Sequence, residues 1–480
     1  MKIFHRLKLL ISKKSIALIS ILLSIVSFAI MHNSGNLDSK HYGIVLLPFA
    51  VFLGSFLLIF LRKKEFRVVS LSIYGMYVFR YIVVATVSVL GNYYIETSPT
   101  IYLNNFNPAC LLMFFEYLFV VLVLCIDRKK SNRTSGLVRR TYILNNSSPS
   151  FLFALLLASL SLVVLMLLIF PSLKSNFFFF FKSTDLRVET KNQYATLSAN
   201  VPGVILYPFV YLVEWIRITL PIVLTVFLLS NFKNRFVKVA SIFTLLTLSI
   251  LITTHVQITG FFVVAVILMY IMENNKHFKR IAWLPLVCAF VVVFILAMDH
   301  YSGLGSPERL ARVLQNYFNG PSNVAAGFGM PRENSIKHFF IDFLYSNSFV
   351  SGVFGIDLDK TSTMAFFNYT RDETQSSIFP FVSQTNYYFG SVFAVAFSSI
   401  VALLGKRIEN IAYSTTNLYL RVLLIFCGFK LGICMTMYFS YSVFAVIWDL
   451  LIPYSIIAFF GCAFRMKTRR FNYGQEFFYS

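Results

Sequence analysis

Long apolar runs recur along the whole chain and are separated by mostly short polar segments. A membrane-spanning helix needs about 20 predominantly apolar residues, and twelve runs are candidates, although the seventh and eighth are short. Their ranges are 15–31, 43–61, 68–90, 108–126, 151–170, 203–230, 239–253, 257–272, 281–298, 388–404, 418–438 and 443–464. Within each run the apolar residues are continuous and do not alternate with polar ones, which argues against a β-barrel. The pattern predicts an all-α polytopic membrane protein with about 12 transmembrane helices.

Lysine and arginine are unevenly distributed between the two sets of connecting segments. The two chain termini and the connecting segments on the same side of the membrane carry 27 of the 42 basic residues. The connecting segments on the opposite side carry 11, and four basic residues lie within the predicted spans. Cytoplasmic loops of membrane proteins are enriched in these residues, so we expect both termini in the cytoplasm. Most of the formal net charge of +22 therefore reflects topology. No nucleic-acid-binding motif accompanies it, and no nucleic-acid partner is expected.

Two of the outer segments are much longer than the others. Residues 171–202 form a basic outer loop within the first part of the chain, 1–298, which holds nine spans. Residues 299–387 form a large outer loop, and 388–480 hold the last three spans and a cytoplasmic tail. Every cytoplasmic segment is short, so function is expected on the outer face.

The composition narrows the class further. Hydrophobic residues make up 57% of the chain and charged residues 13%, and the mean hydropathy is +0.72. A soluble domain has about 25% charged residues, and disordered chains are poor in apolar residues, so both classes are excluded. The six cysteines all lie in apolar segments without CxxC spacing, which argues against a disulfide or zinc framework.

Motifs for nucleotide, metal or nucleophile chemistry are missing from the sequence. It contains no GxxxxGK[ST], GxGxxG, HExxH or GxSxG pattern, which disfavours an ATP-driven pump, a kinase and a zinc protease. No acidic pair has the spacing of a cation site. We therefore expect no cofactor and no metal.

The large outer loop contains two patterns typical of amphipathic helices. Ser306, Pro307 and Glu308 resemble an N-cap, a first-turn proline and a first-turn acid, and apolar residues follow at helical spacing. This helix should stop at the Asn319-Gly320-Pro321 breaker. A second helix should start at Ser335.

Two interpretations of these helices stay open at this point. Both helices could pack as a cap over the bundle with their charges in water. Alternatively, Arg309 and Arg312, which lie one turn apart, could face a cavity and bind a lipid-linked phosphate, because a guanidinium suits bidentate phosphate binding.

Charged residues inside the predicted spans are the other informative class, because burial of such groups is costly. Arg80 and Glu116 lie on spans joined at the outer side and are expected to pair. Glu214 and Arg217 are three residues apart on one helix, so they could neutralise each other; Arg217 could equally line a pocket that opens outwards.

Two local patterns resemble a known family. One is the stretch 317–327, YFNGPSNVAAG, in the large outer loop. The other is 379–390, FPFVSQTNYYFG, which leads into the tenth span. Together with twelve spans and one large outer loop before the last three, they resemble the Wzy-type polymerases of O-antigen and capsular polysaccharide repeat units. The resemblance implies a bundle similar to the GT-C fold.

The resemblance also implies a chemistry. Such a polymerase transfers a growing glycan from one polyprenyl diphosphate to another lipid-linked repeat unit, without a nucleotide. Cationic side chains must stabilise charge on the departing diphosphate, and a base must take the acceptor proton. The candidates for the diphosphate are Arg187, Arg217, Arg309, Arg312 and Arg332. The candidates for the base are Asp299, His300 and His338, with Glu308 and Asp342 as further acids. The candidates for glycan contacts are Gln384 and Tyr387.

Two other functions, a ligase and a transporter, are compared with the polymerase on architecture and internal repeats. An O-antigen ligase has a similar architecture, whereas a lipid-linked oligosaccharide flippase or other transporter usually has internal repeats, which this sequence lacks. The resemblance implies a multi-pass protein of the bacterial inner (plasma) membrane. Its partners would be polyprenyl-diphosphate-linked oligosaccharide, membrane lipid, a chain-length regulator and a flippase.

Overall fold

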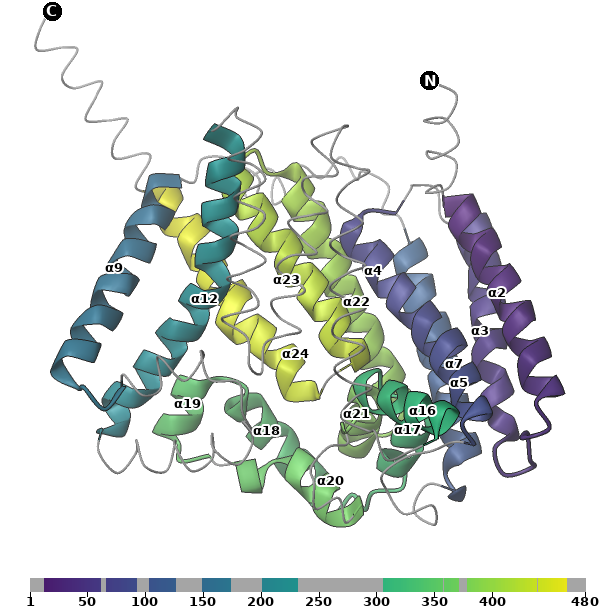
Figure 1. Cartoon of the computed structure of the whole chain (residues 1–480). Helices are drawn as coiled ribbons and strands as arrows, with labels where there is room; N and C mark the ends of the chain where they lie inside the picture. Colours follow the sequence, from purple (N-terminus) through teal and green to yellow (C-terminus); the bar gives the residue numbers. More distant parts are fainter. Residues whose placement is uncertain are drawn as a thin grey trace, which may run out of the picture.

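A computed structural model describes residues 13–61, 66–92, 103–126, 149–173, 201–231, 305–356, 358–370, 378–437 and 439–463. Every regular element in these residues is helical (Figure 1). Within these ranges, nine helices are long and apolar enough to cross a membrane. The chain is therefore a multi-pass helical membrane protein.

The nine spans coincide with the first six and last three predicted spans to within a few residues in most cases. The first six are α2 (Lys13–Asn33), η1 (Tyr42–Val45) with α3 (Leu46–Leu61), α4 (Val68–Val78) with η2 (Phe79–Val84) and α5 (Ala85–Leu90), α7 (Phe106–Cys125), α9 (Pro149–Ile169) and α12 (Gly203–Asn231). The last three are α22 (Ser391–Ser414), α23 (Leu418–Met437), and α24 (Ser440–Val446) continued by η6 (Ile447–Leu451). The predicted spans 239–253, 257–272 and 281–298 lie outside the described residues.

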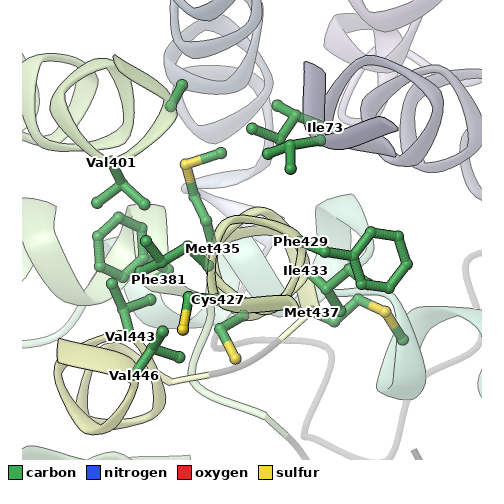
Figure 2. Packing of buried hydrophobic residues seen from close by; sticks show 14 of the residues in the cluster. Ile73, Phe381, Val401, Cys427, Phe429, Ile433, Met435, Met437, Val443 and Val446 are labelled. Carbon is green, nitrogen blue, oxygen red and sulfur yellow. The ribbon is translucent and has the colours of Figure 1, made fainter. Parts of the chain in front are cut away.

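Helix α23 occupies the centre of the bundle. Nearly all of its side chains are buried, and Figure 2 shows them between Ile73 of α4, Val401 of α22 and Val443 of α24. Glycine allows the close approach of α4 to α23. A Cβ added at Gly432 would lie 2.4 Å from the Ile73 side chain.

The large loop folds into short helices that gather at one end of the bundle, opposite the end at which α2 begins (Figure 1). We call this group the cap. It comprises α16 (Ser306–Tyr317), α17 (Pro321–Phe328), α18 (Ser335–Tyr345), α19 (Ser348–Val353), η5 (Leu358–Lys360), α20 (Ser362–Thr370) and α21 (Phe381–Phe389). The two amphipathic helices predicted from the sequence are α16 and α18, and they pack against the bundle as a cap.

The ends of the cap helices refine the sequence interpretation. The N-cap of α16 is Gly305 and not Ser306, because the Glu308 carboxylate accepts a hydrogen bond from the Gly305 N–H at 3.0 Å. After α16, Asn319 has a φ of 49°, a left-handed conformation that asparagine tolerates. The expected start of the tenth span at residue 388 falls inside α21, and Gly390, with a φ of 94°, turns the chain into α22.

The predicted spans leave residues 405–417 as a connecting loop, but α22 continues to Ser414, so most of this segment is helical. Two buried charges lie in this part of α22 and contact the ends of neighbouring helices. The Lys406 ammonium donates to the carbonyls of Val123, Leu124 and Ile126 at 3.2, 2.8 and 2.6 Å, and so caps the C-terminus of α7. Cations are favourable at helix C-termini, where carbonyls lack partners.

Glu409, one turn further along α22, caps the opposite kind of helix end. Its carboxylate accepts from the N–H of Val69 at 2.6 Å and from the Ser70 hydroxyl at 2.6 Å, at the N-terminus of α4. One helix thus supplies a cation to the end of α7 and an anion to the start of α4, each with the sign that the helix dipole favours.

Replacing Lys406 by methionine should lower the free energy of unfolding by about 2 kcal/mol, the size expected for losing hydrogen bonds from a charged donor. The measurement is thermal unfolding of the purified protein in detergent. Arg407→Met is the matched control, because Arg407 is the exposed neighbour. Equal destabilisation by the two substitutions would contradict the capping role.

Candidate functional site

The second half of the cap brings together residues from two parts of the large loop. The His338 Nδ1 atom of α18 lies 2.7 Å from the Tyr387 hydroxyl of α21. Arg332, just before α18, donates to the Asn386 side-chain oxygen at 3.1 Å. The same oxygen accepts from the Ser391 hydroxyl at 2.8 Å, at the first residue of α22. We call Arg332, His338, Asn386 and Tyr387 the cap site.

Exposure differs across the cap site. Arg332 is exposed, His338 is half-buried, and Asn386 and Tyr387 are buried. Burial lowers the pKa of His338, and the positive charge of Lys337 lowers it further. Burial, together with the charge of Asp342, raises the pKa of Tyr387 to about 12. At neutral pH the site therefore combines an exposed cation, an uncharged imidazole and a protonated phenol.

A buried carboxylate lies one turn after His338 on α18. Asp342 accepts from the Ser362 N–H at 3.1 Å, from the Ser362 hydroxyl at 2.5 Å, from the Gln384 amide at 3.1 Å and from the Tyr388 hydroxyl. Burial raises the pKa of Asp342, and these four hydrogen bonds oppose the rise. The carboxylate joins α18, α20 and α21 in one network.

Gln384 extends this network to the bundle. Its side-chain oxygen accepts from the Ser440 N–H at 2.6 Å, at the first residue of α24. The Ser440 hydroxyl lies 3.0 Å from the Tyr388 hydroxyl. Gln384 is fully buried, so both ends of its amide are used within the protein. In this arrangement it orients α21 and α24 around the cap site.

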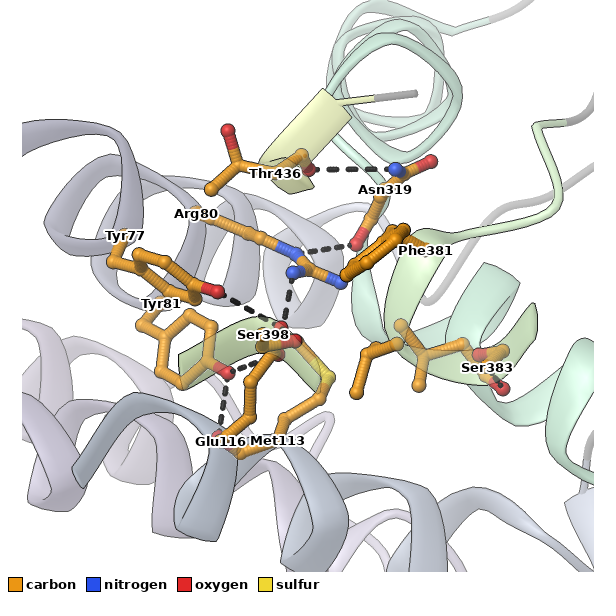
Figure 3. Close-up of polar contacts among 12 residues, drawn as sticks. Tyr77, Arg80, Tyr81, Met113, Glu116, Asn319, Phe381, Ser383, Ser398 and Thr436 are labelled. Atoms are coloured by element: carbon orange, nitrogen blue, oxygen red, sulfur yellow. Dashed lines mark hydrogen bonds and ion pairs between the residues drawn. The ribbon is translucent and has the colours of Figure 1, made fainter. Parts of the chain in front are cut away.

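A second group of buried charges lies within the spans, on η2 and α7 (Figure 3). The expected pairing of Arg80 with Glu116 is confirmed, with a nitrogen–oxygen distance of 3.6 Å and both side chains almost fully buried. Glu116 also accepts from the hydroxyls of Tyr77, Tyr81 and Ser398 at 2.8, 3.1 and 2.9 Å. A buried ion is tolerated only when such partners compensate for its lost hydration.

Arg80 also reaches the cap. Its Nε atom donates to the carbonyl of Asn319 at 2.8 Å, and the Asn319 side-chain amide donates to the carbonyl of Thr436 at 3.3 Å. Figure 3 shows the ring of Phe381, the first residue of α21, beside the guanidinium. The turn between α16 and α17 is therefore held by a charge from η2.

The remaining predicted residues lie elsewhere. Arg309 and Arg312 are on α16, which packs mainly against α5, α17 and η2. Arg217 is on α12, and its side chain is not described. Asp299, His300 and Arg187 lie outside the described residues. The structure thus joins Arg332, His338 and Tyr387, with Gln384 in the adjoining network.

Several residues of this region were not singled out from the sequence. Asn386 neighbours Tyr387 within the quoted pattern 379–390, so position in that pattern could have identified it. Ser362 and Ser440 carry no comparable signal, since isolated serines are common in helical membrane proteins. Their role depends on contacts with residues far away in the chain.

Within the described ranges, no three His, Cys, Asp or Glu side chains gather in a group that could hold a metal ion. The chain matches no protein-family model, no curated protein and no solved structure.

Arg80→Met should destabilise the protein by roughly 3 kcal/mol or more, because it leaves Glu116 buried without a counter-charge. Adding Glu116→Gln to this variant should recover part of the loss, since an uncharged amide needs no cation. Thermal unfolding of the two single variants and the double variant in detergent measures this coupling. Simple additivity of the two single effects would show that the pair is not coupled.

Proposed function

We propose that this protein is a polysaccharide polymerase that acts on lipid-linked repeat units at the outer face of a bacterial plasma membrane. It would join two polyprenyl-diphosphate-linked oligosaccharides by transferring the growing glycan from one carrier to the other. The oxygen of an acceptor hydroxyl bonds to the anomeric carbon of the donor, the bond from that carbon to the diphosphate breaks, and the hydroxyl proton passes to a base.

One observation carries this proposal: an exposed arginine and a half-buried, uncharged histidine lie together at the end of a membrane bundle. Arg332 and His338 both contact neighbouring residues of α21, Asn386 and Tyr387. Transfer from a diphosphate carrier requires a cation for the leaving group and a base for the acceptor. Both groups are available here, and residues 317–327 and 379–390, which resemble the polymerase family, belong to the same cap.

In the proposed reaction Arg332 binds the diphosphate. A guanidinium forms paired hydrogen bonds with phosphate oxygens and cannot lose its charge at neutral pH. Its hydrogen bond to Asn386 orients it while the side chain stays exposed. As the bond between the anomeric carbon and the diphosphate breaks, negative charge grows on the departing diphosphate, and a fixed cation stabilises that charge.

His338 acts as the base in this proposal. Because burial and Lys337 lower its pKa, the imidazole is uncharged at neutral pH and able to accept a proton. In the tautomer in which Nδ1 donates to the Tyr387 oxygen, Nε2 carries the free lone pair. Tyr387 keeps its own proton because its pKa is raised to about 12.

The proposed orientation of the protein in the membrane is based on the distribution of Lys and Arg among the connecting segments. The bias of Lys and Arg toward the segments on the side of the chain ends favours cytoplasmic termini, and the cap lies at the opposite end of the bundle (Figure 1). The cap would therefore face the compartment in which lipid-linked repeat units are assembled into polymer.

Deleting the gene should leave surface glycan as single repeat units on a gel, and re-expression of the wild-type protein should restore the polymer ladder. Arg332→Gln should fail to restore the ladder, because the leaving diphosphate loses its cation. Lys360→Gln is the matched control, since Lys360 is an exposed cap cation on η5. It should restore the ladder fully.

Other outcomes of this experiment would point elsewhere. Loss of all surface glycan with intermediates inside the cell would indicate a flippase. Full-length glycan from Arg332→Gln at normal expression would remove Arg332 from the site.

The pH dependence of polymer formation tests the base separately. Activity should fall as the pH drops through the pKa of His338, at a lower pH than for an ordinary histidine. Lys337→Gln removes a positive charge that disfavours protonation, so the pKa of His338 should rise and the acid limb of the profile should move to higher pH. The profile is measured with membranes or purified protein, and an unmoved acid limb would argue against His338 as the base.

A further inference from the structure

Five large apolar side chains on consecutive cap helices are exposed. Ile336 and Phe340 lie one turn apart on α18, and Phe349, Val353 and Phe354 lie on or just after α19. Each is between 44% and 67% exposed. The two helices contact each other, and exposed apolar side chains gathered on neighbouring elements are typical of contact with a membrane or another molecule.

The depth of α18 along the bundle identifies the contact. Its inner face packs between two membrane-spanning helices: the ring of Phe339 meets Phe397 of α22 and Phe444 of α24 at centroid distances of 6.5 and 5.8 Å. Phe343 meets Trp448 of η6 at 5.3 Å. Trp448 is eight residues after Ser440, about 12 Å along the span at 1.5 Å per residue. Side chains of α18 therefore pack alongside the first turns of α22 and α24, at the cap end of the bundle.

Helix α19 lies at a similar depth against other spans. The Asn347 side chain, which also caps α19, donates to the Asp449 carboxylate of η6 at 3.1 Å. Gly352 lies so close to the Tyr207 ring of α12 that an added Cβ would approach it to 2.1 Å. The exposed side chains of α19 thus continue the apolar outer surface of α12, where Val204 is 84% exposed.

Basic residues border this apolar surface. Arg332, four residues before Ile336, and Lys337, directly after it, are both exposed, and Arg332 belongs to the cap site. An apolar face with cations at its rim fits lipid acyl chains with phosphate headgroups above them. At the start of α22, Val392 and Phe393 are likewise exposed.

We propose that the exposed face of α18 and α19 is a lipid-binding surface inserted into the membrane leaflet on the cap side. The partner is phospholipid, and Arg332 and Lys337 lie at the level of its phosphate groups. The packing depth of α18 and the exposure of its apolar side chains support this insertion independently of the proposed function.

A consequence rests on the proposed function. If the cap site opens onto lipid, a carrier diphosphate reaches Arg332 by lateral diffusion within the leaflet, while its chain stays in the membrane. The acceptor sugar would approach from the water side of the cap.

Fluorescence quenching in proteoliposomes tests the insertion. Tryptophan is introduced by Phe340→Trp on α18 and, in a second variant, by Phe349→Trp on α19. The added emission is the difference from the parent protein, which has three tryptophans. Val392→Trp supplies the lipid-facing reference, and Asn368→Trp on the exposed side of α20 supplies the water-facing reference.

Phospholipids brominated on their acyl chains should remove most of the added emission of Phe340→Trp and Phe349→Trp, as for Val392→Trp. They should leave Asn368→Trp unchanged, and acrylamide should quench only that variant strongly. Quenching of Phe340→Trp and Phe349→Trp by acrylamide but not by brominated lipid would place the face in water and overturn the proposal. Protection from both quenchers would show that protein covers it and would overturn it equally. No glycan enters this assay, so a chain that inserts but makes no polymer would refute the proposed function alone.

Discussion

The assembly of the cap depends on one buried carboxylate. An isolated charge or acid in an apolar interior costs several kcal/mol unless donors surround it, and Asp342 finds its donors only when three cap helices meet. Ser362 comes from α20, and Gln384 and Tyr388 come from α21. No single helix can satisfy this group, so α18, α20 and α21 must dock together. His338 and Tyr387, the neighbours of Asp342 and Tyr388 on the same two helices, are brought into contact by that docking.

Two charges from the spans connect the cap to the bundle, and both lie in π-helical segments. Arg80 in η2 donates to Asn319 between α16 and α17, and Asp449 in η6 accepts from Asn347 before α19. π-Helical turns are rare and occur often at functional sites. Here each one carries a charge whose cap partner lies between two cap helices. Two junctions between cap helices are thereby held to the spans, one before and one after Arg332 and His338 in the chain.

Local patterns predicted the fold well, and long-range contacts limited the prediction of the site. Nine spans appear where apolar windows of about 20 residues lie, because length and hydropathy are local properties. Arg332, His338 and Tyr387 were selected as chemically suitable residues of one loop, and they do converge. The partners of Asp342 could not be selected in this way, because Ser362 has no distinguishing sequence pattern. Its role follows only from the hydrogen bond to Asp342, 20 positions earlier in the chain. Lys406 and Glu409 were similarly assigned to a loop, because the helix ends that they cap belong to other spans.

Reconstitution of the purified protein tests the central claim most directly. The protein in liposomes is supplied with a polyprenyl-diphosphate-linked repeat unit as both donor and acceptor, without any nucleotide, and the products are separated by size. We predict a ladder of glycans that lengthens by one repeat unit at a time, with release of free carrier diphosphate. Recovery of only the single repeat unit, under conditions in which the protein is folded and inserted, would contradict the assignment of this membrane protein as a polymerase.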